Sequence, residues 1–196
     1  MLMCAAVVIA LAGCALTGTE PSPSATPSPS ETSTPTPSAE PLTLVECEVL
    51  LPIDQARALF GADTEFLGER PIAESGGWFP LAEIDSTLAD ATQVRSCAWG
   101  VPNSDGVFTV AAVEVTPEQR STLETALTDA GFTDVTTGTV TGFEMTGENE
   151  VGPTAATHLF TGPVWIMSNA ADLGTTGPAA NAALESLRTA NPTLGL

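Results

Sequence analysis

His158 is the only histidine in the 196-residue chain and therefore the first residue to examine for chemistry. As the base of nucleophilic catalysis it would need a Ser or Cys beside it and a carboxylate behind it. The chain has no Gly-x-Ser-x-Gly motif, and Ser-x-x-Lys cannot occur because there is no Lys. We therefore expect His158 to be a partly exposed strand residue, with contact to a ligand as the alternative.

A metal site would have to combine His158 with carboxylates such as Glu144, Glu148 and Glu150. The spacing of Glu148 and Glu150 does not match the Asp-x-Asp-x-Asp-Gly pattern of a calcium loop. No two cysteines form a Cys-x-x-Cys motif. The sequence therefore predicts no metal and no cofactor.

Pairs of carboxylates could act as the acid and base of a glycosidase. With 24 acidic residues in the chain, some pair will lie close together by chance, so the sequence singles out none. A cell-envelope hydrolase that uses carboxylates stays open as an alternative function.

Two large aromatic residues, Trp78 and Phe79, follow two glycines in a segment that reads as a loop. Aromatic side chains on a loop are plausible contacts for a ligand or a partner protein. The other interpretation, which we favour, is that both fold back to cover an edge of the sheet.

The excess of acidic residues limits the possible partners. The 24 Asp and Glu face only five Arg, for a net charge of −19 at pH 7. A field of this sign repels nucleic-acid phosphates and anionic lipid headgroups. We therefore expect no nucleic-acid binding. The acidic residues are dispersed along the chain, and we expect them to keep a monomeric protein soluble. The alternative is a cation-binding module.

The N-terminal segment 1–13 is apolar and uncharged, and it is too short to span a bilayer. Such a segment ending in small residues is typical of a secretory signal. Leu11-Ala12-Gly13-Cys14 resembles the lipobox of bacterial lipoproteins. The resemblance implies removal of residues 1–13, a lipid on Cys14, and an anchor in the cell membrane on its extracytoplasmic face. The alternative is a plain signal peptide cut elsewhere, with Cys14 incidental.

The remaining cysteines are then expected to form a disulfide. Cys4 would leave with the signal and Cys14 would carry the lipid, which leaves Cys47 and Cys97 in a compartment where disulfides persist. Closing this loop should stabilise the fold by roughly 3–4 kcal/mol. A thiol pair for redox chemistry or metal binding is the alternative.

Residues 14–41 follow the signal as a tract of Pro, Ser and Thr. Such a composition cannot bury apolar surface, and its prolines favour extended chain. We expect a disordered linker that holds a single globular domain, residues 42–196, away from the membrane.

The pattern of the domain predicts an α+β fold. Helices are expected over 52–60, 84–91, 117–130 and 178–190, and strands over 65–67, 94–100, 107–115, 139–146, 155–159 and 164–168. Thr116 and Gln119 form a capping box before the third of these helices. Because hairpins join the strands, we expect a two-layer domain in which helices cover one side of an antiparallel sheet.

Two further motifs carry a second resemblance. Cys47-x-x-Leu50-Leu51 and Cys97-x-Trp99 resemble actinobacterial surface lipoproteins of uncharacterised function. The resemblance implies an exported, membrane-tethered domain with a structural disulfide and Trp99 packed near it. It implies no reaction, so the expected function is binding or scaffolding, with an envelope protein or a small molecule as ligand.

Overall fold

A seven-stranded antiparallel sheet forms the centre of the domain, in the order β1-β2-β3-β7-β6-β5-β4. A computed structural model describes residues 40–71 and 77–196, and the predictions for the signal peptide, Cys14 and the linker lie outside them. The strands are β1 (Glu65–Glu69), β2 (Val94–Gly100), β3 (Val107–Glu114), β4 (Thr133–Asp134), β5 (Thr141–Glu148), β6 (Pro153–Thr161) and β7 (Val164–Ala170). The helices are α1 (Cys47–Leu50), α2 (Ile53–Phe60), α3 (Ala82–Asp90), α4 (Pro117–Asp129) and α5 (Leu173–Ala190).

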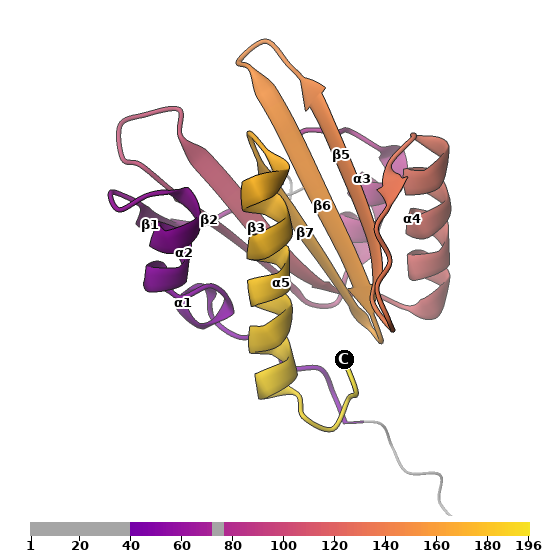
Figure 1. Cartoon of the computed structure of the whole chain (residues 1–196). Coiled ribbons are helices and arrows are strands. Elements are labelled where there is room, and N and C mark those ends of the chain that lie inside the picture. The colour runs from indigo at the N-terminus through magenta and orange to yellow at the C-terminus, as the bar shows by residue number, and fades with distance from the viewer. Residues whose placement is uncertain (1–39, 72–76) are drawn as a thin grey trace, which may run out of the picture. The chain divides into compact units, whose positions relative to one another are not determined.

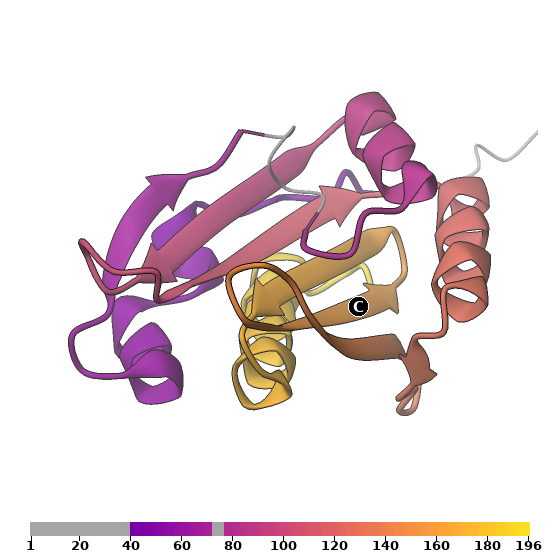
Figure 2. The ribbon, with the colours of Figure 1, turned by 90° about the horizontal axis from the view of Figure 1, so that it is seen from above.

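Helices cover both faces of the sheet (Figures 1 and 2). Side chains alternate along β3, so that Phe108 and Val110 face the core under α1, α2 and α5, whereas Ala111 and Val113 face the core under α3 and α4. The α+β class and the antiparallel sheet are confirmed. The arrangement differs from the expected two layers because the central strands are apolar on both faces, and each face needs its own cover.

The disulfide predicted from the cysteine count is present. Cys47, at the start of α1, is bonded to Cys97 in β2, with 5.8 Å between their Cα atoms. Both cysteines are buried, and so is Trp99, whose ring stacks on Phe108 in the same core. The bridge therefore fixes the first helix of the domain to the sheet.

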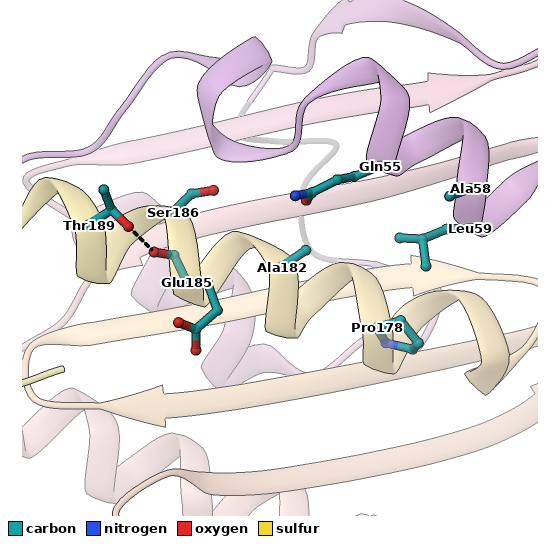
Figure 3. Close-up of a pocket in the computed structure, with 8 residues that line it drawn as sticks. All are labelled: Gln55, Ala58, Leu59, Pro178, Ala182, Glu185, Ser186 and Thr189. Atoms are coloured by element: carbon teal, nitrogen blue, oxygen red, sulfur yellow. Dashed lines mark hydrogen bonds between the residues drawn. The ribbon is translucent and has the colours of Figure 1, made fainter.

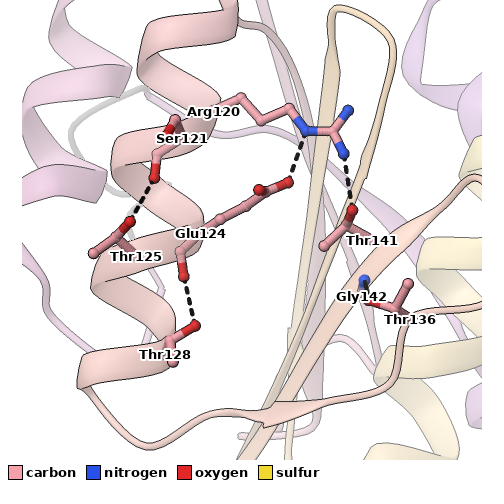
Figure 4. A network of polar contacts seen from close by, with 8 residues as sticks. All are labelled: Arg120, Ser121, Glu124, Thr125, Thr128, Thr136, Thr141 and Gly142. Atoms are coloured by element: carbon pink, nitrogen blue, oxygen red, sulfur yellow. Dashed lines mark hydrogen bonds and ion pairs between the residues drawn. The ribbon is translucent and has the colours of Figure 1, made fainter.

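Helix α4 has the predicted capping box. Thr116 Oγ1 accepts a hydrogen bond from the Gln119 backbone N–H at 3.2 Å, and Gln119 Oε1 accepts one from the Thr116 N–H at 2.9 Å. One turn on, Arg120 pairs with Glu124 through Nε and donates to Thr141 Oγ1 of β5 through Nη2 (Figure 4). This network holds α4 against the edge half of the sheet.

Helix α5 begins five residues earlier than the pattern predicts. Asp172 is its N-cap and accepts a hydrogen bond from the Thr175 N–H at 3.0 Å, so Pro178 lies inside the helix. The missing N–H of Pro178 removes one helical hydrogen bond. The burial of Thr175, Thr176 and other residues in the first turns offsets that loss.

Replacing both bridge cysteines (Cys47→Ala with Cys97→Ala) should lower the free energy of unfolding by about 4 kcal/mol, because the unfolded chain is no longer closed into a loop. Urea unfolding followed by circular dichroism measures the change. The wild-type chain under reducing conditions is the control and should unfold together with the double variant. Equal stability of the oxidised and reduced wild type would contradict the prediction.

Candidate functional site

His158 lies in the core under α3 and α4, only 1% exposed, and not in the partly exposed position that we expected. Its Nδ1 accepts a hydrogen bond from Trp165 Nε1 at 3.1 Å, and its ring is parallel to the indole ring. The Phe132 ring also packs against His158 in a T-shaped contact, with 5.2 Å between the ring centroids. A residue enclosed in this way is structural.

The environment of His158 keeps the imidazole neutral. Burial lowers its pKa from the ordinary 6.5 to about 3, because a charged ring would lose its hydration. Since Nδ1 accepts a hydrogen bond, the proton of the neutral ring is assigned to Nε2. His158 is therefore not charged near neutral pH.

The carboxylates considered with His158 for a metal site do not join it. Glu144 is paired with Thr157 in the sheet, and both side chains point to the α5 face. His158 is the next residue along β6 and points to the opposite face. Within the described residues, no three His, Cys, Asp or Glu side chains lie close enough to hold a metal ion.

Phe79 folds back onto the sheet, as the favoured interpretation expected. Its ring makes a T-shaped contact with Phe132, with 5.7 Å between the ring centroids. It also lies so close to Gly147 of β5 that a Cβ there would come within 3.0 Å of Phe79 Cε1. Phe79 therefore covers the end of the core in which His158 is buried.

Trp78 takes a different direction and lines a cleft of about 500 Å³. This hairpin-end cleft is lined by the β2–β3 and β5–β6 hairpins and by Ala171, just before α5. Figure 1 shows the two hairpins and the start of α5 toward the upper end of the domain. Both apolar and polar residues line it: Phe60, Leu67, Arg70, Trp78, Ser104, Asp105, Gly106, Val107, Asn149, Val151, Gly152, Pro153, Thr154 and Ala171. Of the three residues proposed as ligand contacts, only Trp78 reaches it.

Exposed apolar side chains concentrate at this cleft. Only four large hydrophobic residues in the described part of the chain are exposed, and two of them, Val151 at 82% and Leu67 at 41%, line it. Clustered apolar exposure of this kind marks interaction sites more often than scattered residues do. Sequence reasoning missed Val151, although an apolar residue in the short segment between the strands expected over 139–146 and 155–159 was a usable signal.

A second groove runs between α2 and α5 (Figure 3), with a volume of about 450 Å³. Its lining is mostly small or polar: Gln55, Ala58, Leu59, Pro178, Ala182, Glu185, Ser186 and Thr189. It contains no aromatic side chain and one charged group, so it offers fewer specific contacts than the hairpin-end cleft.

Two cavities are each lined by two carboxylates. Glu83 and Asp129 line one of about 310 Å³, in which Glu83 is half-buried and Asp129 is exposed. Asp90 and Glu118 line a cavity of about 400 Å³ between α3 and α4. Both residues are exposed to solvent, whereas the general acid of a glycosidase is typically held in an apolar pocket.

Comparisons of the chain with protein-family models, with curated proteins and with solved structures gave no match. Within residues 40–71 and 77–196, no helix is both long enough and apolar enough to cross a bilayer. The geometry of the site therefore carries the functional argument.

The buried His158 predicts a specific loss of stability in acid. Between pH 6.5 and about 3 the unfolded chain binds a proton that the folded chain does not, so stability falls as the pH falls, by up to about 1.4 kcal/mol per pH unit. Above pH 6.5 this contribution is fully present.

The His158→Gln variant should lack this dependence, while it keeps every carboxylate and an acceptor for Trp165. Urea unfolding at pH 7.0, 5.5 and 4.5 measures the free energy of unfolding of both proteins. As the pH drops, the free energy of unfolding of the wild type should fall by more than that of the variant. Parallel pH profiles would show that His158 is protonated in the folded domain.

Proposed function

We propose that this protein is a lipid-anchored domain of the cell envelope, held on the extracytoplasmic face of the membrane, that binds another envelope protein through its hairpin-end cleft. The observation that carries the binding proposal is the exposure of Val151 and Leu67 beside Trp78. Val151 stands at a hairpin tip, so its contact partner has to be a surface that closes over the tip. A protein offers such a surface, whereas a small molecule would fill only the hollow.

The anchor rests on Leu11-Ala12-Gly13-Cys14 and on the apolar segment before it. The disulfide between Cys47 and Cys97 supports export, because such bonds persist in oxidising compartments outside the cytoplasm. The high negative charge of the chain would be repelled by anionic lipid headgroups. This repulsion supports attachment through a lipid and not through electrostatic attraction.

The point of attachment supports the role of the cleft. At the start of the described chain, Thr43 exchanges two hydrogen bonds with Asn191, just after α5, and Thr193 Oγ1 donates to the Glu40 carboxylate. The hairpin-end cleft lies at the opposite end of α5, beside Ala171. The 18 residues of α5 separate the two ends by about 27 Å. The described domain therefore begins near the end of α5 that lies away from the cleft.

The anchor has a direct test. Cys14→Ala should move the protein from the membrane fraction to the medium or to the soluble envelope fraction, because the residue that receives the lipid is gone. Cell fractionation with immunoblotting measures the distribution. Cys4→Ala is the matched control and should stay with the membrane. Membrane retention of the Cys14→Ala chain would refute the anchor.

The cleft has a spectroscopic test that does not require the partner's identity. Trp99 and Trp165 are 0% exposed, so acrylamide should quench mainly Trp78, and Trp78→Phe should remove most of that quenching. Adding solubilised envelope proteins should shield Trp78 in the wild-type chain.

The matched variants separate the cleft from other apolar surface. Val151→Asp should abolish the shielding, because a carboxylate at the tip would be desolvated on contact. Val49→Asp replaces another exposed valine, 55% exposed on α1, and should not change it. Shielding that survives Val151→Asp, or no shielding at all, would refute binding at the cleft.

A further inference from the structure

A polar groove lies between α3 and α4, on the face of the sheet opposite α5. Figure 2 shows the two helices side by side. The groove consists of two cavities, of about 400 Å³ and about 310 Å³, that adjoin at Thr122. We call it the α3–α4 groove, between residues 83–90 and 116–129. Apart from Ala126, every residue that lines it carries a hydroxyl, an amide or a carboxylate.

Each of the two cavities contributes a pair of carboxylates. Asp90, the last residue of α3, and Glu118, in the first turn of α4, line the larger one. Glu83 and Asp129 line the smaller one. Among the ion pairs of residues 40–71 and 77–196, none includes any of these four side chains. The groove is therefore acidic at both ends.

No basic residue neutralises these ends from the two helices themselves. Helix α3 contains no Arg, and α4 contains only Arg120. Arg120 points away from the groove, because it pairs with Glu124 at 2.7 Å and donates to Thr141 of β5 at 2.8 Å (Figure 4). None of these three residues lines the groove. A cation that enters it therefore meets unpaired carboxylates.

The end of α3 adds to the negative potential of the larger cavity. The C-terminus of a helix carries the equivalent of about half a negative elementary charge. The last turn of α3 contains no basic residue, and in the described chain the N–H of Ala91, which follows Asp90, makes no hydrogen bond to this turn. The carbonyl groups at this end remain as acceptors for a cationic donor.

A buried hydroxyl points to a ligand independently of the charges. Thr87 is only 5% exposed and lines the same cavity as Asp90. Its hydroxyl has no hydrogen-bond partner in the described residues, whereas the neighbouring Ser86 donates to the Glu83 carbonyl at 3.2 Å. Thr87 Oγ1 is not among the fully occluded unpaired atoms of the described chain, so it keeps access to the cavity. A donor group in the cavity would satisfy it.

We infer that the α3–α4 groove binds an extended basic segment of a partner protein, with one Lys or Arg side chain at each end. One cation pairs with Asp90 and Glu118. The other pairs with Glu83 and Asp129. The two ends are about 10 Å apart along α3 and about 16 Å apart along α4. In an extended chain, residues i and i+4 lie about 13 Å apart on the same side, so basic residues four positions apart fit this spacing.

The groove favours an extended chain over a single small cation. No three His, Cys, Asp or Glu side chains in the described residues lie close enough to hold a metal ion, and a simple amine would pair with one end only. The middle of the groove is lined by hydroxyls, including those of Ser86 and Thr122, which can accept hydrogen bonds from peptide N–H groups. The net charge of −19 attracts a basic segment from a distance.

Two peptides of equal composition test the inference. The spaced peptide is acetyl-Lys-Ser-Ser-Ser-Lys-amide, and the adjacent peptide is acetyl-Lys-Lys-Ser-Ser-Ser-amide. Titrated into the full chain at low salt, the spaced peptide should shift the backbone amide NMR signals of Thr87 and Thr122. It should bind at least about threefold more tightly than the adjacent peptide, as expected for one further exposed ion pair. Added salt should weaken both.

Variants assign the two ends. Asp90→Asn with Glu118→Gln removes one pair of carboxylates, and Glu83→Gln with Asp129→Asn removes the other. Each double variant should lose the preference for the spaced peptide, because only one acidic end remains.

The matched control is Asp85→Asn with Glu48→Gln, which removes the same net charge at exposed residues outside the groove. This control should keep the preference. Thr87→Val keeps the shape of the side chain without its hydroxyl and should weaken the spaced peptide.

Three results would overturn the inference. The first is the absence of shifts at Thr87 and Thr122. The second is equal affinity of the wild type for the spaced and adjacent peptides. The third is tighter binding of spermine than of the spaced peptide, which would identify the occupant as a free oligoamine. None of them would affect the anchor or the hairpin-end cleft, which are tested at Cys14 and Val151.

Discussion

The pairing of β3 with β7 is the contact on which the rest of the structure depends. It joins two strands that are 50 residues apart in the chain, in antiparallel register from Thr109 with Asn169 to Glu114 with Val164. On one side of it lie β2 and β1, and on the other lie β6, β5 and β4. Strands β1 to β3 come from the first part of the chain, with α3 between β1 and β2, and β4 to β7 come from the second part, so this one pairing joins two antiparallel halves into a single sheet. The burial of both strands on both faces then requires helices on both sides.

The sequence allowed the local elements to be predicted but not their arrangement in layers. Strand β2 and the capping box of α4 were found because their signals are local: a short strand-like segment over 94–100, and Thr116 followed three residues later by Gln119. The disulfide followed from the count of cysteines that an exported chain would retain. The second helical layer was not predicted, because α3 is short and its signal weak, and because nothing local says to which face α4 returns.

The candidate site shows the same limit. Trp78 and Phe79 are neighbours with similar chemistry, yet one lines a cleft and the other covers a core, since the choice depends on Phe132, more than 50 residues away. The sequence pattern placed His158 in a strand, but it could not show that Phe132 and Trp165 pack against its ring and bury it. Val151 was overlooked because an exposed apolar residue gains its meaning only when Leu67 and Trp78 are brought beside it.

Helix α5 explains why clefts occur where they do. Its buried face is made largely of small residues, including Ala179, Ala180 and Ala183, which let the backbone lie close to the sheet. Side chains this small cannot fill the space on either flank of the helix, so a groove remains toward α2 and a cleft remains toward β5. The first turn of the helix adjoins the hairpin-end cleft, and Asn191 after its last turn holds the start of the domain. A single alanine-rich helix thus borders these clefts and holds the start of the described domain.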